Sequence, residues 1–85
     1  MSDLDAAFTQ AQQDVTALAA DPGNDAKLTL YGLYKQATAG DVSGKKPGML
    51  DMVGRAKYDA WSKVRGLSTD EAKQRYVDYV RGLGA

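Results

Sequence analysis

Apolar residues recur three or four positions apart in four stretches of the chain, a spacing that places them on one face of an α-helix. The first stretch covers about sixteen residues, and its apolar positions are Leu4, Phe8, Ala11, Val15 and Leu18. The second covers about residues 25–39, with Ala26, Leu30, Leu33 and Ala37. The third covers about residues 51–65, with Val53, Ala56, Ala60, Trp61 and Val64. The fourth follows Ser68, with Ala72, Tyr76, Tyr79, Val80 and Leu83.

Turn-forming and capping residues separate these stretches. Residues 21–23 (Asp-Pro-Gly) end the first helix, and Gly40 and Gly66 follow the second and third. Helix-capping residues stand at three of the four predicted starts: Ser2 with Asp5, Asn24, and Ser68 with Glu71. The loop before the third helix is longer than a tight helix hairpin needs, which allows a crossover. We therefore predict an all-α four-helix bundle, in one domain over residues 1–85.

Histidine and cysteine are both absent from the 85 residues. Without cysteine there is no disulfide, thiolate nucleophile or cysteine-ligated metal, and without histidine the usual metal ligand and neutral-pH proton carrier is missing. Only carboxylates, lysines and tyrosines remain for catalysis. We therefore predict a protein with no catalytic residues, no metal and no cofactor.

The chain contains no run of about twenty apolar residues, the length needed to span a bilayer. Its first residues are acidic where a signal peptide would be basic. These features predict a cytoplasmic protein without stable membrane insertion, and no additional apolar stripe calls for a second copy, so we predict a monomer.

Charge is distributed unevenly although the formal net charge is zero. Residues 1–25 carry five acids and no base, whereas residues 27–65 carry eight bases and three acids, a local excess of five positive charges. The basic middle is suited to an anionic partner, or it is only a solvated face. A neutral total disfavours general nucleic-acid binding.

A group of phenols and cations falls on one face of the second predicted helix. Its members are Lys27, Tyr31, Tyr34, Lys35 and Thr38, beside the Leu30 and Leu33 stripe. Aromatic rings that can stack, together with ammonium groups, suit a phosphorylated nucleotide. The alternative is that the two tyrosines pack in the core while the lysines extend into solvent.

Three further residues bear on this choice. Lys57 lies one turn before Trp61 on the third helix, and Gly54 lies in its first turn, where free backbone amides favour an anion. Gly32, inside the second helix, marks a close approach by either a ligand or a neighbouring helix.

Three ordered segments together resemble the acyl-CoA-binding protein family. They are residues 31–41 (YGLYKQATAGD), 47–51 (PGMLD) and 54–61 (GRAKYDAW). A looser likeness extends from Phe8 to Leu83. The resemblance implies an up-down-down-up bundle with an open bowl that holds acyl-CoA, the nucleotide in the bowl and the acyl chain in an apolar groove.

The resemblance also implies roles for individual residues. Tyr31, Lys35 and Lys57 would hold the ribose 3′-phosphate, Tyr34 would stack on adenine, and Tyr76 would reach in from the fourth helix. The acyl path would be lined by Leu28, Met52 and Ala56. The remaining expected ligand-binding residues are Thr16, Lys27, Gly32 and Leu33. Many members of the family have a basic residue where this chain has Thr16 or Asp21, so we expect a weaker hold on the nucleotide.

The function implied is non-catalytic binding and intracellular transport of medium- to long-chain acyl-CoA thioesters. Two other classes remain open at this point. An enzyme acting on thioesters would need a base or nucleophile, which the composition disfavours. A protein- or nucleic-acid-binding bundle would use the basic middle segment instead.

Overall fold

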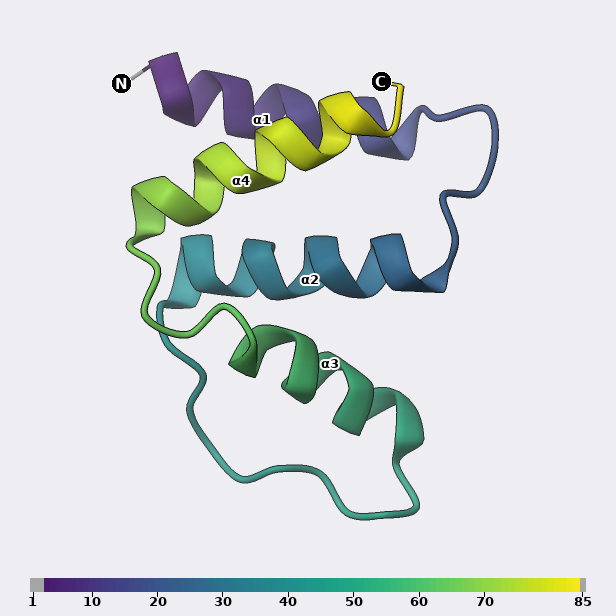
Figure 1. Cartoon of the computed structure of the whole chain (residues 1–85), viewed down its shortest axis with the longest axis vertical. Coiled ribbons are helices and arrows are strands. Elements are labelled where there is room, and N and C mark those ends of the chain that lie inside the picture. Colours follow the sequence, from purple (N-terminus) through teal and green to yellow (C-terminus); the bar gives the residue numbers. More distant parts are fainter. Residues whose placement is uncertain (1–2, 85) are drawn as a thin grey trace.

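The computed structural model describes residues 3–84, and all of the regular structure in that range is α-helical. The four helices are α1 (Asp3–Thr16), α2 (Asn24–Ala39), α3 (Met52–Ser62) and α4 (Thr69–Gly82). Figure 1 shows α1 and α4 side by side and running in one direction, with α2 and α3 running in the other. The predicted all-α, up-down-down-up order is therefore confirmed.

The helices are not packed equally against one another. Helix α4 packs against both α1 and α2, while α3 packs on α2. The resulting molecule is flat, with extents of 37 × 29 × 15 Å. Helix α3 and the long connection before it therefore lie along one edge of the molecule, away from α1 and α4 (Figure 1).

The core is built by α1, α2 and α4. Its buried members are Phe8, Ala11, Leu30, Leu33, Ala37, Ala72, Tyr76, Val77 and Val80. Helix α3 contributes no fully buried residue. Val53, predicted on the apolar face of the third helix, is 68% exposed, so that face is only partly covered. An apolar face on a helix at the edge of a flat bundle finds only one neighbour to cover it.

Helix boundaries differ from the predicted ones in three places. Leu18 lies beyond α1, and α3 ends at Ser62 rather than near Arg65. Asn24 is the first residue of α2 and not its cap; Gly23 stands at the cap position with φ of 94° and no side-chain bond. The predicted Ser2 cap lies outside the described residues.

Two helix starts are capped by side chains. The Ser68 hydroxyl accepts a hydrogen bond from the Glu71 N–H at 3.0 Å, which confirms the predicted cap of α4. The Asp51 carboxylate accepts from the Gly54 N–H at 2.9 Å and caps α3. Each bond satisfies a backbone donor that the helix itself cannot pair.

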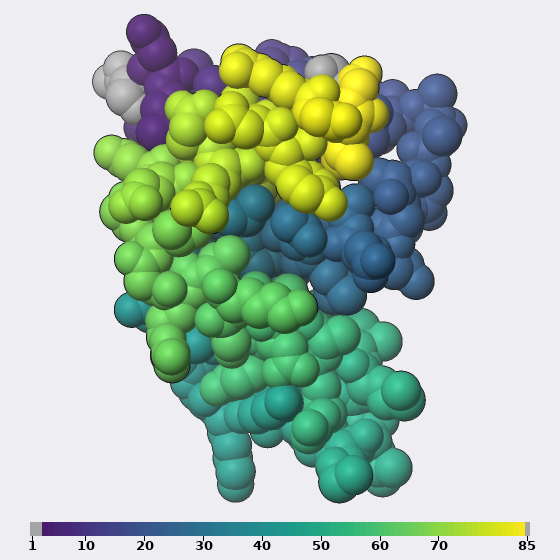
Figure 2. Space-filling view, viewed as in Figure 1, coloured from purple at the N-terminus to yellow at the C-terminus, as the bar shows by residue number. Residues whose placement is uncertain are grey.

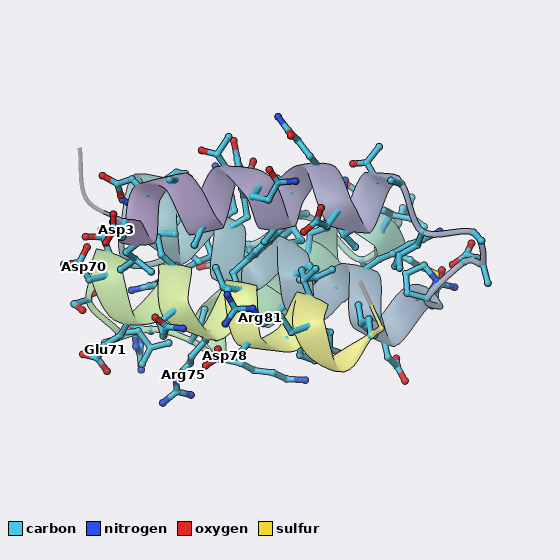
Figure 3. The ribbon with its side chains drawn as sticks, turned by 90° about the horizontal axis from the view of Figure 1, so that it is seen from above. Asp3, Asp70, Glu71, Arg75, Asp78 and Arg81 are labelled. Atoms are coloured by element: carbon cyan, nitrogen blue, oxygen red, sulfur yellow. The ribbon has the colours of Figure 1, made fainter. Side chains whose placement is uncertain are left out.

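Acidic side chains gather where α1 and α4 begin. Asp3 lies in the first turn of α1, and Asp70 and Glu71 lie in the first turn of α4. Because the two helices run in parallel, Figure 3 shows these three residues together at one end of the pair. Negative charge at a helix N-terminus is stabilised by the helix dipole. The Lys73 ammonium also pairs with the Asp5 carboxylate at 2.6 Å, which joins α4 to α1.

The crossover loop, residues 40–51, is held to α3 mainly through its backbone carbonyls. The Trp61 Nε1–H donates to the Gly40 carbonyl at 2.8 Å, the Tyr58 hydroxyl to Gly44 at 3.2 Å, and Arg55 to Pro47 at 3.2 Å. One ion pair, Lys46 with Asp59 at 2.9 Å, adds to these bonds. Helix α3 therefore positions the loop that precedes it.

Gln36 and Asp41 join three segments at the C-terminal end of α2. The Gln36 amide is 1% exposed and donates to the Asp41 carboxylate and the Leu67 carbonyl, both at 2.8 Å. The Gly66 N–H donates to the same carboxylate oxygen of Asp41 at 2.8 Å. The hydrogen bond from Gln36, followed by that from Gly66, holds the pKa of Asp41 below its ordinary value.

Gly32 is the point of closest approach between α2 and α3. A Cβ added there would contact the Ala60 carbonyl oxygen and would lie 2.8 Å from its carbon. Those atoms are backbone and cannot rotate away. The alternative of close helix packing, left open by the sequence, is the one that this contact supports.

Replacing Gly32 by alanine should lower the free energy of unfolding by about 1–3 kcal/mol, the usual cost of forcing an extra methyl group into a packed contact. Urea denaturation followed by circular dichroism measures the change. The matched control is Gly82→Ala, because a Cβ there meets nothing within 4 Å. If both variants retained the parental stability, the close α2–α3 contact would be refuted.

The Asp41 bonds predict a particular loss of stability in acid. A folded-state pKa below the ordinary 3.8 gives a stabilisation that is complete above that value and disappears as the pH falls through the folded-state pKa. Asp41→Asn cannot titrate, so its unfolding free energy should fall less steeply between about pH 4 and pH 2. Urea titrations at several pH values measure this slope. An unchanged slope, with Asp70→Asn as the control, would contradict the prediction.

Candidate functional site

Two cations lie over two aromatic rings where α2 faces α3. The Lys57 ammonium lies 5.4 Å from the centre of the Tyr31 ring, and the Lys35 ammonium lies 4.9 Å from the centre of the Trp61 ring. Residues 31 and 35 are one turn apart on α2, as are residues 57 and 61 on α3. The parallel helices therefore match turn for turn, and each contributes one lysine and one aromatic ring.

Both ammonium groups remain available to an anion. The ion pairs formed among residues 3–84 use other lysines, namely Lys27, Lys46 and Lys73. Contact with the face of a ring satisfies a cation only partly, because the remaining N–H donors of the ammonium point elsewhere. Lys57 is exposed, while Lys35 and Tyr31 are half-buried. This wall can bind a phosphate without first breaking a salt bridge.

Tyr34 belongs to a second aromatic group, on the side of α2 that faces α1 and α4. Its ring lies 6.1 Å from the ring of Phe8, with an angle of 26° between the planes. The ring of Tyr76 meets Phe8 edge-on at 5.1 Å. Tyr34 is 40% exposed, so one face of its ring can receive a planar base supported from behind by Phe8.

Tyr76 lies deeper than Tyr34. It is 5% exposed and belongs to the core. Burial, together with a smaller contribution from Tyr34, raises the pKa of the Tyr76 phenol. The hydroxyl therefore stays protonated well above neutral pH and remains a hydrogen-bond donor.

A hollow of about 560 Å³ opens between α2 and α3. Leu28 and Ala56, both expected on the acyl path, line it from opposite helices. Ala56 also lines a second hollow of about 350 Å³ with Met49 and Met52. Ala56 and Asp59 line both hollows, so the two hollows adjoin along α3 and are called the groove below.

The other expected ligand-binding residues lie apart from this groove. Thr16 lines a separate hollow on α1, and its hydroxyl donates to the Gln12 carbonyl at 2.9 Å. Lys27 is paired with Asp21 at 2.8 Å. Leu33 is 4% exposed in the core, and Gly32 lies against the backbone of α3.

The Lys27–Asp21 pair explains the state of both side chains. The hydrogen bond from Lys27, and then that from the Gly23 N–H at 2.8 Å, hold the pKa of Asp21 below its ordinary value. Asp21 therefore remains ionised and neutralises the lysine. Of the two lysines predicted on α2, Lys27 is paired with a carboxylate, whereas Lys35 lies over the Trp61 ring and forms none of the ion pairs described above.

The sequence did not single out three charged residues that line the larger hollow. These are Asp25 from α2, Asp59 from α3 and Lys63 at the C-cap of α3. The signal that could have found them is helical spacing, because Asp25 lies one turn before Leu28, and Asp59 and Lys63 follow Ala56 by one and two turns. Within the described residues no three Asp, Glu, His or Cys side chains are arranged so that they could hold a metal ion. None of the described helices combines the length and the apolar character of a membrane span.

Comparison with known proteins gives consistent matches over most of the chain. A family model described as acyl CoA binding protein matches residues 5–80. An acyl-CoA-binding protein of Brassica napus is 50% identical over 76 residues, which cover 89% of this chain and 83% of that protein. The crystal structure of acyl-CoA-binding protein 2 of Oryza sativa matches with a TM-score of 0.89 at 40% identity, covering 94% of this chain and 87% of that one.

A third relative is much longer. Enoyl-CoA delta isomerase 2 of Rattus norvegicus is 47% identical over 78 residues, which cover 92% of this chain. The chain spans about a fifth of that protein, since the matched segment is 20% of its length.

Proposed function

The chain belongs to the acyl-CoA-binding protein family, and we propose that it binds and buffers medium- to long-chain acyl-CoA thioesters as a monomer in the cytoplasm. The observation that carries the proposal is the matched pair of contacts between α2 and α3, Tyr31 with Lys57 and Lys35 with Trp61. These contacts present two cations and a phenol to one anionic group. The hollows lined by Leu28, Ala56 and Met52 on the same two helices supply a place for the acyl chain of the same ligand.

For the head group, we propose that Tyr31, Lys35 and Lys57 bind the ribose 3′-phosphate. Charge-assisted hydrogen bonds of this kind contribute about 1.5–3 kcal/mol each. Adenine stacks on Tyr34, whose ring is exposed on one side and backed by Phe8. Tyr76, buried behind them, donates its hydroxyl only to a ligand group that reaches between α2 and α4.

For the tail, we propose a path along Leu28, Ala56 and Met52, which line the adjoining hollows. Each methylene removed from water contributes about 0.8 kcal/mol, so ten of them give about 8 kcal/mol before the costs of association. The acyl chain therefore contributes most of the affinity. Asp25, Asp59 and Lys63 also line the larger hollow, so part of its wall is polar.

Catalysis is not part of the proposal. The sequence contains no histidine and no cysteine, and the activity named for the isomerase relative belongs to a protein of which this chain spans a fifth. Incubation of the pure protein with palmitoyl-CoA should leave the thioester intact, as measured by mass spectrometry.

Nucleic-acid binding is the rival use of the basic residues. Palmitoyl-CoA should raise the melting temperature of the protein, and an oligonucleotide should not.

Calorimetry should find palmitoyl-CoA bound far more tightly than coenzyme A, because only the thioester fills the apolar groove.

Lys57→Gln should lower the affinity for palmitoyl-CoA about tenfold or more, because the contact with the phosphate is lost. The same substitution should have little effect on palmitoyl-dephospho-CoA, which lacks the 3′-phosphate. Arg81→Gln, on the exposed end of α4, is the control. Equal losses for both ligands would assign Lys57 to another part of the head group.

Removing the carboxylate that pairs with Lys27 should raise the affinity for the nucleotide part of acyl-CoA. Asp21→Asn leaves the ammonium of Lys27 one turn from Tyr31, and we expect a gain in affinity of about two- to threefold at low ionic strength that disappears in 1 M salt. Calorimetry at both salt concentrations measures it. Asp14→Asn on α1 removes the same charge elsewhere. A gain of equal size in that variant would place the effect in net charge and not in Lys27.

A further inference from the structure

Four large apolar side chains are exposed within one short segment where the crossover loop meets α3. Met49, Leu50, Met52 and Val53 are 83%, 101%, 78% and 68% exposed. Across the rest of the described chain, the only other large apolar side chain in the exposed class is Tyr34, at 40%. Clustered exposure of this kind marks a contact surface, whereas single exposed apolar residues do not. We call these four residues the apolar corner.

The apolar corner lies at the edge of the molecule. Figure 1 shows the loop and the start of α3 on the side opposite α1, α4 and both marked ends of the chain. In the space-filling view the same segment forms the protruding lower edge (Figure 2). Met49 and Met52 line one shallow hollow there. A flat partner can therefore reach these side chains without displacing any helix.

Positive charge surrounds the apolar corner. Residues 45–57 contain the bases Lys45, Lys46, Arg55 and Lys57 and one acid, Asp51. The carboxylate of Asp51 is bonded to the N-terminus of α3, where the helix dipole offsets its charge. Arg55 and Asp59 line the same hollow as Met49 and Met52. Asp59 is paired with Lys46 at 2.9 Å, so the positive charge of the surface comes from Lys45, Arg55 and Lys57.

The acidic residues of α1 and α4 lie elsewhere. Asp3, Asp70 and Glu71 gather where those two helices begin (Figure 3). The surface around the apolar corner is therefore cationic even though the whole chain has no net charge.

We propose that the apolar corner docks on the surface of an anionic phospholipid bilayer. The four side chains enter the interfacial layer, and the surrounding lysines and arginine stay among the negative headgroups. Apolar side chains beside cations are the composition that binds such interfaces reversibly. A protein partner is disfavoured because it would have to match both features with a complementary acidic and apolar face.

Docking has a consequence for cargo that rests on the proposed function. Met52 belongs both to the apolar corner and to the proposed acyl path, so a docked molecule would have the end of that path at the lipid surface. The docking itself does not depend on acyl-CoA. It is therefore tested without ligand, and its failure leaves the proposed function standing.

The test is sedimentation of the intact ligand-free protein with vesicles of phosphatidylcholine containing phosphatidylserine, compared with pure phosphatidylcholine. We expect binding to the mixed vesicles that weakens in salt, and little binding to the neutral ones. Leu50→Gln/Val53→Gln should weaken vesicle binding about tenfold or more. Lys45→Gln should weaken it about fivefold. Both variants should bind palmitoyl-CoA as the parent does.

Two matched controls test the location. Ala6→Gln/Thr9→Gln places two glutamines on the exposed face of α1, and Arg81→Gln removes a base from α4; neither should change vesicle binding. Absence of binding to the mixed vesicles would overturn the proposal. Equal losses in the controls would also overturn it. So would a dimer of the parent protein that forms without lipid and is absent in Leu50→Gln/Val53→Gln by ultracentrifugation, because the apolar corner would then bind a second copy. Lys45→Gln, which leaves all apolar contacts intact, keeps the test valid if the double variant is unstable.

Discussion

The contact between Gly32 of α2 and the backbone of Ala60 in α3 determines where the residues proposed to face the ligand lie. Only glycine permits this approach, because any side chain would meet a carbonyl group that cannot move aside. With the two backbones in contact and the helices parallel, the residues on either side are matched turn for turn. Tyr31 then meets Lys57, Lys35 meets Trp61, and Leu28 faces Ala56. The paired lysines and rings, and the hollow between the two helices, thus follow from one close helix pair.

The residues that form the core are largely separate from those proposed to face the ligand. Helices α1, α2 and α4 bury the core, while α3 buries none of its own residues completely. Helix α3 is held instead by its contact with α2, by the hydrogen bonds of its side chains to the crossover loop, and by the Gln36–Asp41 bonds near its end. Exposed apolar residues on α3 are therefore compatible with a stable fold, because the core does not depend on them.

Much of the fold was predictable because three helices carry a buried stripe. Their apolar positions repeat at the helical period. The start of α4 was predictable from Ser68, because a serine hydroxyl caps a helix through a local hydrogen bond. The exposure of Val53 on α3 was not predictable, since the same repeat arises whether a stripe faces a core or a lipid or ligand. The sequence also could not show that Asp21 neutralises Lys27, nor that Tyr76 lies behind Phe8 and Tyr34. Such facts depend on distances between elements, which local spacing does not contain.

The crossover loop accepts its hydrogen bonds from α3 at the carbonyl oxygens of Gly40, Gly44 and Pro47. Every residue type has a carbonyl, so these three bonds survive changes in the identity of the loop residues. Ser43, for example, is exposed between two of the anchoring positions. The loop is thus a suitable place to attach a fluorophore or to insert a recognition peptide without altering the rest of the bundle.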